Sequence, residues 1–209
     1  MKTMKQTYKL SHPFEVSLGS YGGNQMWFKN KYMLKTGCGP VALTNLYAWF
    51  KGLSLSRDDF EGLQNLTSKY LKGPVVMPQQ FILGARRLFR QESYQLNPIH
   101  LTLLQTNPKT WNQGLAFIAT SLESDNPVAL LIGPNRPKAS YHRDFSNHWV
   151  LITAMTLSKD KDEVRLTVSS WGAVYHLDLK ALLDSKFFLS LVSLRIKKSS
   201  TKEPSIALD

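Results

Sequence analysis

The chain contains very little cysteine: Cys38 is the only one among 209 residues. A single cysteine excludes an intramolecular disulfide framework and a zinc site built from several thiolates. Long apolar runs are also missing, since none approaches the roughly 20 residues that a membrane span needs. The first 20 residues are charged and polar and lack the apolar segment of a signal peptide. These shortages predict a protein without a membrane span, and a cytoplasmic location is the default expectation.

Acidic residues are outnumbered, with 15 Asp and Glu against 26 Lys and Arg, and the net charge is +11. A balance of this kind permits binding to nucleic acid or to an anionic surface. The sequence offers no recognition helix, no basic segment interleaved with aromatic residues and no zinc knuckle to support that function. We therefore interpret the charge as a solvated basic surface, with no specific nucleic-acid partner. A weaker functional role is the attraction of an acidic substrate.

The stretch around Cys38 predicts a buried helix. It reads Gly37-Cys38-Gly39-Pro40 and continues with apolar residues on nearly every side as far as Phe50. Proline suits a first helical turn, and a helix that is apolar all round is a buried one. The thiol would then lie at the positive end of this helix, where the pKa of a cysteine falls and backbone amides can bind an anion. A lone cysteine is more often a small buried residue, but glycines on both sides favour the close approach of a substrate chain.

The rest of the chain predicts helices first and antiparallel strands later, which is an α+β order in a single domain. Helices are expected from Ser56, from Pro78 and from Trp111, with at most a short strand at 99–104 between the last two. Strands are expected at 128–132, 148–156, 163–170, 173–177 and 187–196. The domain divides into an N-terminal arm (1–20), a mainly helical lobe (20–125), an antiparallel sheet lobe (126–196) and a loose tail (197–209). The cysteine helix would pack on the sheet, and the two lobes would form the walls of a cleft.

Thiol chemistry requires a nearby base, and His148 is the best placed of the five histidines. It opens the apolar strand Trp149-Val150-Leu151-Ile152, so its side chain would project from a rigid base. If the following turn is centred near Asp160, antiparallel pairing places His148 opposite about residue 172. The segment Ser169-Ser170-Trp171-Gly172 should therefore lie beside the imidazole, where a residue that orients the base is needed.

Three motifs in this order resemble those of the papain-like cysteine peptidases: Gly37-Cys38-Gly39-Pro40 opening a helix, Asn147-His148-Trp149-Val150-Leu151, and Val168-Ser169-Ser170-Trp171-Gly172. The closer likeness is to the bacteriocin-leader-peptidase-like (double-glycine peptidase-like) branch. The resemblance covers roughly residues 20–196, and it implies a papain-like fold whose N-terminal helix carries the cysteine and packs on a C-terminal antiparallel sheet.

The resemblance also implies a role for each candidate residue. Cys38 would be the nucleophile and His148 the general base, which later donates its proton to the leaving group. Papain-like enzymes orient the histidine with Asn or Asp, and this sequence has Ser169 at that position; a hydroxyl can accept the hydrogen bond but brings no charge. Ser170, Asp144 and Asp178 are alternatives. Gln25, with Asn24 and Asn30 as rivals, and the Cys38 amide would stabilise the oxyanion.

The predicted function is a cysteine peptidase or amidase that acts on a peptide or amide substrate and requires no metal or other cofactor. An acyltransferase on the same scaffold and a catalytically inactive peptide-binding module are the alternatives. A zinc site built from His142, Asp144 and His148 is disfavoured, because their spacing sets no ligand geometry. The sequence favours no particular oligomeric state.

Overall fold

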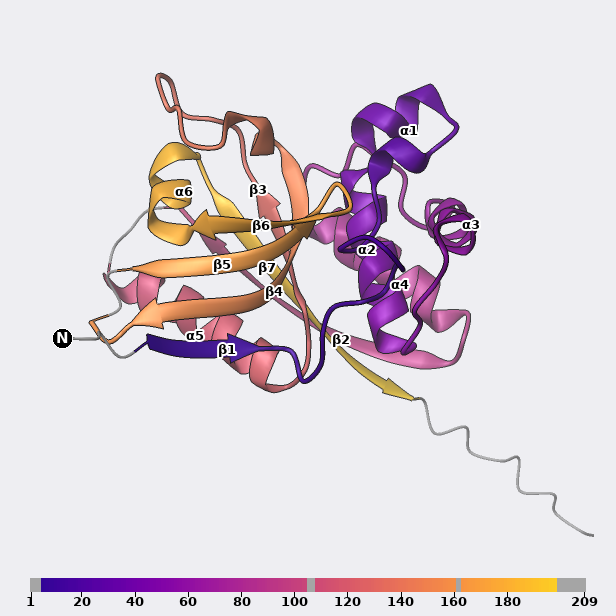
Figure 1. The fold of residues 1–209 in the computed structure, drawn as a ribbon, viewed down its shortest axis with the longest axis horizontal. Coiled ribbons are helices and arrows are strands. Elements are labelled where there is room, and N and C mark those ends of the chain that lie inside the picture. The colour runs from indigo at the N-terminus through magenta and orange to yellow at the C-terminus, as the bar shows by residue number, and fades with distance from the viewer. Residues whose placement is uncertain (1–4, 105–107, 161–162, 199–209) are drawn as a thin grey trace, which may run out of the picture.

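A seven-stranded antiparallel sheet organises the computed structural model, which describes residues 5–104, 108–160 and 163–198 (Figure 1). The strand order is β2-β7-β3-β4-β5-β6, and β1 pairs with the far half of β4. The strands are β1 (Lys5–Lys9), β2 (Tyr94–Leu103), β3 (Val128–Ile132), β4 (His148–Ser158), β5 (Val164–Ser170), β6 (Ala173–Asp178) and β7 (Leu189–Lys198).

Six α-helices accompany the sheet in the described residues, so the predicted α+β class is confirmed. They are α1 (Lys31–Thr36), α2 (Cys38–Phe50), α3 (Arg57–Thr67), α4 (Pro78–Arg90), α5 (Pro108–Glu123) and α6 (Leu179–Ser185), with 3₁₀ helices η1 (Gln25–Trp27) and η2 (Arg143–Phe145). The first four helices gather at one end of the sheet, whereas α5 and α6 lie over its other part (Figure 1).

Helix α2 is the buried helix that the sequence predicts. Every residue from Gly39 to Trp49 is buried. The helix packs against β4 on one side and against α3 and α4 on the others. Trp149 of β4 stabilises the packing of these helices on the strand. Its ring stacks on Phe81 of α4, and its Nε1 donates a hydrogen bond of 2.7 Å to the Val75 carbonyl. The cysteine helix is therefore held against the strand that begins with His148.

The helical region contributes more to the sheet than the sequence suggests. Strand β2 has ten residues and pairs with β7 along its whole length, from Tyr94 opposite Lys198 to Leu103 opposite Leu189. The sequence predicted only a short strand at 99–104. The N-terminal arm supplies β1, in agreement with the extended arm or initial strand that the sequence predicts there. Strand β7 includes Lys197 and Lys198, which were predicted to begin a loose tail. The rest of that tail, 199–209, lies outside the described residues.

Candidate active site

Cys38 is the first residue of α2, as the sequence predicts. Gly37 ends α1 and begins α2, and it provides no side-chain cap for the first turn of α2. Pro40 has no amide hydrogen, so the first-turn donors that surround the sulfur are the amides of Cys38 and Gly39. Burial raises the pKa of the Cys38 thiol, and hydrogen bonds from these two amides and from that of Trp149 offset this effect in part.

The glycines that flank Cys38 also have a packing role. A side-chain carbon on Gly39 would lie 2.8 Å from Val75, and one on Gly37 would lie 2.6 Å from the Phe28 ring. The space beside each glycine is therefore filled by the protein itself. Both glycines let neighbouring segments approach the start of α2 closely.

One small pocket collects most of the predicted site residues. Its lining comes from the start of η1, the start of α2, the start of β4 and the β5–β6 turn, and consists of Gln25, Cys38, Val41, Ala42, Asn45, His148, Trp149, Ser169, Ser170 and Trp171. The cavity has a volume of about 10 Å³, which is close to the space that one water molecule occupies. Cys38 itself is only partly buried, whereas His148 is buried.

His148 is enclosed on several sides and bonded to one serine. Its Nε2 lies 2.7 Å from the Ser170 Oγ. Its ring stacks on Trp171, with centroids 4.2 Å apart, and the ring of Phe145 packs edge-on at 5.6 Å. Only 6% of the residue is exposed. The Ser170 contact fixes the ring through Nε2, and Nδ1 has no hydrogen-bond partner among the described residues.

Ser169, the predicted orienting residue, contacts the backbone instead of the imidazole. Its hydroxyl donates a 2.6 Å hydrogen bond to the Tyr21 carbonyl. A side-chain carbon on Gly22 would lie 2.4 Å from the Ser169 Oγ. The loop that contains Gly22 therefore packs closely on this serine. The alternative Asp178 caps α6 through the Ala181 amide, and Asp144 lies in η2. Of the four candidates, Ser170 is the residue that the structure pairs with His148.

The β5–β6 turn explains why the second serine reaches the imidazole. Leu151 pairs with Ser169, which is the register that the sequence predicts for β4 and β5. Strand β5 ends at Ser170, and Trp171 and Gly172 form the turn with φ of 48° and 74°. Two positive φ values are typical of a tight hairpin turn. This turn carries Trp171 onto His148, with Ser170 directly before it.

Gln25 lines the pocket, whereas its two rivals are engaged elsewhere. Its Nε2 donates one hydrogen bond of 2.9 Å to the Leu34 carbonyl, and its Oε1 is buried without a partner among the described residues. Asn24 donates to the Trp171 carbonyl and Asn30 caps α1. An amide nitrogen carries two hydrogens, so Gln25 keeps one donor for another acceptor.

Burial sets the charges of the pair. It raises the pKa of the Cys38 thiol, and the three backbone amides offset this only in part. Burial also lowers the pKa of His148 to about 3. At neutral pH the closed site therefore holds a neutral thiol and a neutral imidazole, instead of the thiolate and imidazolium that the position at a helix start suggested.

Phe145 and Lys186 contribute to this site, but no sequence motif marks either residue. Lys186 is completely buried, and its ammonium donates to the Asn135 side chain and to the carbonyls of His142 and Tyr141. These contacts fix the position of segment 133–147, and Phe145 of this segment packs on His148. A buried lysine with no nearby motif could be found only from the fold.

Neither a membrane helix nor a metal cluster is found in the described part of the chain. No helix there combines the length and apolar character needed to cross a membrane. No group of three or more His, Cys, Asp or Glu side chains there is arranged to hold a metal ion, and this includes His142, Asp144 and His148.

Comparison with protein-family models gave no match for this chain, and comparison with curated proteins gave none either.

Proposed function

We propose that this protein is a papain-like cysteine hydrolase, a peptidase or amidase with Cys38 as nucleophile and His148 as general base. The observation that carries the proposal is the shared pocket in which Cys38, at a helix start, meets a histidine oriented by a buried hydroxyl. A nucleophile, a base and a group that fixes the base are the parts that covalent acyl transfer needs. The order of the three sequence motifs supports the same function.

The neutral pair defines how the first step would run. As the Cys38 Sγ bonds to the substrate carbonyl carbon, its proton passes to the Nδ1 of His148. The carbonyl oxygen takes the negative charge and accepts from the Cys38 amide and from the second Nε2 hydrogen of Gln25. His148 then protonates the leaving amine, which departs and leaves a thioester on Cys38. Water attacks the thioester with His148 again as base and releases the acid.

Ser170 acts by positioning in this scheme. With the ring proton on Nε2, His148 donates to the Ser170 Oγ, and the lone pair of Nδ1 is available to the thiol. A hydroxyl brings no negative charge to stabilise an imidazolium. The proton is therefore held on His148 only during the reaction, in agreement with the lowered pKa of this residue.

Acylation of Cys38 by a p-nitrophenyl ester tests the proposal. The ester is small and activated, and intact-mass measurement reports the acyl group on the protein. We expect the native protein to be acylated at Cys38 and His148→Gln to react about 10²-fold more slowly, because general-base catalysis contributes about that much. Glutamine roughly preserves the volume but has no basic nitrogen. Equal acylation rates in the two proteins would exclude His148 as the base.

A binding module without catalysis is the second candidate, and the closed site favours it. The pocket has room for about one water, and burial raises the pKa of the thiol. If this is the function, the ester leaves Cys38 unmodified at neutral pH in both proteins, and a peptide that binds protects Cys38 from iodoacetamide without being cleaved.

A further inference from the structure

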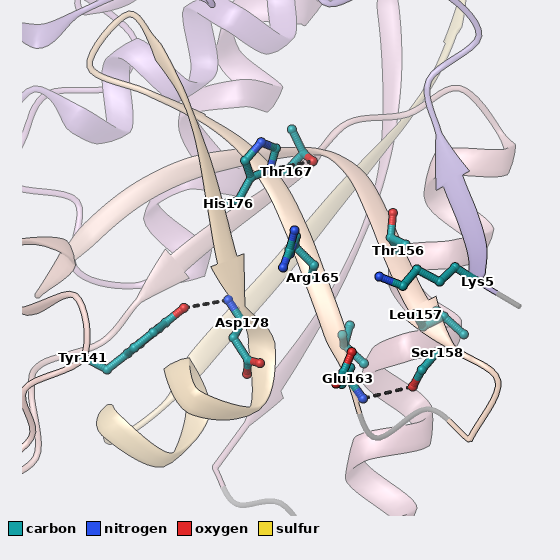
Figure 2. Close-up of a pocket in the computed structure, with 11 residues that line it drawn as sticks. Lys5, Tyr141, Thr156, Leu157, Ser158, Glu163, Arg165, Thr167, His176 and Asp178 are labelled. Atoms are coloured by element: carbon teal, nitrogen blue, oxygen red, sulfur yellow. Dashed lines mark hydrogen bonds between the residues drawn. The ribbon is translucent and has the colours of Figure 1, made fainter. Parts of the chain in front are cut away.

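A second hollow lies on the open face of the sheet and shares no lining residue with the Cys38 pocket. Its volume is about 640 Å³. Strands β1, β4, β5 and β6 form its floor, and Tyr141 stands at one side (Figure 2). Small-molecule sites commonly measure about 300–1,000 Å³. The hollow is large enough for a ligand of metabolite size.

Strand register places polar side chains together on this face. Arg165 pairs with Thr156 on one side and with Asp178 on the other, and Thr167 pairs with His176. Lys5 pairs with Ser158, two residues along β4 from Thr156. Side chains two residues apart on a strand share a face. The same face thus carries two permanent cations, a histidine and several hydroxyls.

The two cations have no ionic partners of their own. Among the described residues neither Lys5 nor Arg165 forms an ion pair, although Glu163 and Asp178 line the same hollow. Figure 2 shows both cationic side chains extending over the hollow from opposite sides of Thr156. Asp178 pairs with Arg165 across the strands and Glu163 lies two residues before it, but neither carboxylate forms an ion pair with the two cations. Both cations therefore remain available to an anionic group, and a guanidinium binds two of its oxygens at once.

Two further polar groups line the hollow, His176 at one end and Tyr141 beside Asp178 at the other (Figure 2). The Thr167 Oγ1 lies 3.3 Å from the Nδ1 of His176, and Nε2 is a donor in the tautomer in which the Thr167 hydroxyl donates to Nδ1. The Tyr141 hydroxyl accepts a 2.7 Å hydrogen bond from the Asp178 amide, and its own proton remains available. A phosphate has enough oxygens for several such donors, whereas a carboxylate has only two.

The other end of the hollow is acidic. Glu163 and Asp178 lie there, away from His176 and Thr167 (Figure 2). One oxygen of Asp178 caps α6 through the Ala181 amide, and the second oxygen can accept from a ligand. Carboxylates bind the hydroxyls of sugars well, because they accept from two donors side by side. This end suits the neutral, hydroxyl-rich part of a ligand.

We propose that this hollow binds a phosphorylated polyol of the sugar-phosphate class. The phosphate lies between Lys5, Arg165 and His176, and the polyol hydroxyls donate to Glu163 and Asp178. The two pockets share no lining residue, so the outcome of this proposal does not depend on the proposed hydrolase activity.

Isothermal titration calorimetry at low ionic strength tests the proposal with three probes. Ribose 5-phosphate carries both features, inorganic phosphate only the anion, and ribose only the polyol. We expect ribose 5-phosphate to bind at least tenfold more tightly than either of the others. If it binds no more tightly than inorganic phosphate, the hollow attracts anions in general and the proposal is overturned; absence of binding has the same consequence.

Matched variants locate the binding. Arg165→Gln should weaken ribose 5-phosphate about tenfold, as expected for the loss of a charge-assisted hydrogen bond. Arg90→Gln removes the same charge beside a different hollow and should leave the affinity unchanged. Glu163→Gln should weaken ribose 5-phosphate but not inorganic phosphate. Equal losses in the two arginine variants would show that only the net charge matters, which contradicts the site.

Discussion

At the scale of the residue, His148 is the clearest case of burial controlling chemistry. Trp171 and Phe145 exclude water from its ring, and the only hydrogen-bond partner among the described residues is an uncharged hydroxyl. Such surroundings penalise the imidazolium and lower the pKa of His148 to about 3. His148 therefore couples folding stability to pH.

Acid should destabilise the native protein through His148. Between its ordinary pKa of 6.5 and the folded value of about 3, the unfolded chain binds a proton that the folded protein does not. The free energy of unfolding consequently falls as the pH drops through this window, by about 1.4 kcal/mol per unit at most. We expect urea midpoints to fall more steeply between pH 6.5 and 4 in the native protein than in His148→Asn. Parallel curves would show that His148 is not the cause.

Substitution of the two adjacent serines should have different effects, one on the acylation rate and the other on stability. Ser170→Ala removes the hydroxyl bonded to Nε2 of His148 and should slow ester acylation of Cys38 about tenfold or more. Ser169→Ala loses the bond to the Tyr21 carbonyl and should mainly reduce stability, by about 1–3 kcal/mol. Acylation rates and urea midpoints of both variants provide the comparison. A greater loss of acylation in Ser169→Ala would restore Ser169 as the orienting residue.

The serines also show how far sequence reasoning reaches at this scale. Counting residues across the hairpin predicted the β4–β5 register and placed the segment 169–172 beside His148. The choice between Ser169 and Ser170 depends on the close Gly22 loop and on the positive φ of Trp171, neither of which is encoded locally.

At the scale of the element, the start of α2 depends on a residue without a side chain. Gly39→Ala would place a carbon 2.8 Å from Val75, in a region that is already filled. We expect a loss of about 1–3 kcal/mol in the free energy of unfolding, as for other overpacked sites. Gly62→Ala in α3 is the matched control, because its added carbon meets open space and should stabilise by about 0.5–1 kcal/mol. Equal urea midpoints for the two variants would contradict this packing role.

Elements with local signals could be predicted, and those without could not. Ser56 caps α3 through the Asp59 amide, and Pro78 opens α4, as expected from their residue types. Helix α1 was missed because a basic six-residue segment carries no apolar period; its start depends on the Asn30 cap. Strand β2 was underestimated because it is completed by β7, far away in the chain.

At the scale of the whole molecule, one buried cluster joins the helical and sheet parts. It includes Leu43 and Leu46 of α2, Ile118 of α5, Leu130 of β3 and Val168 of β5. Apart from a small cluster of Phe28, Met33 and Val41, the buried apolar residues of the described helices and strands belong to this one cluster. The two parts should therefore depend on each other for stability.

Thermal unfolding should show a single transition for this reason. We expect far-UV circular dichroism, which reports mainly on the helices, and fluorescence of Trp149 and the other tryptophans to share one midpoint. Two well-separated midpoints would mean that the helical part and the sheet unfold on their own.

The pairing of distant strands also has a consequence for biosynthesis. Strand β2 is complete at residue 103, yet its partner strand β7 begins at residue 189. A ribosome adds the residues between them in on the order of ten seconds, since translation proceeds at roughly 5–20 residues per second. Throughout that interval the edge of β2 that pairs with β7 has no partner strand. The nascent chain is therefore a natural client for chaperones until its last strand emerges.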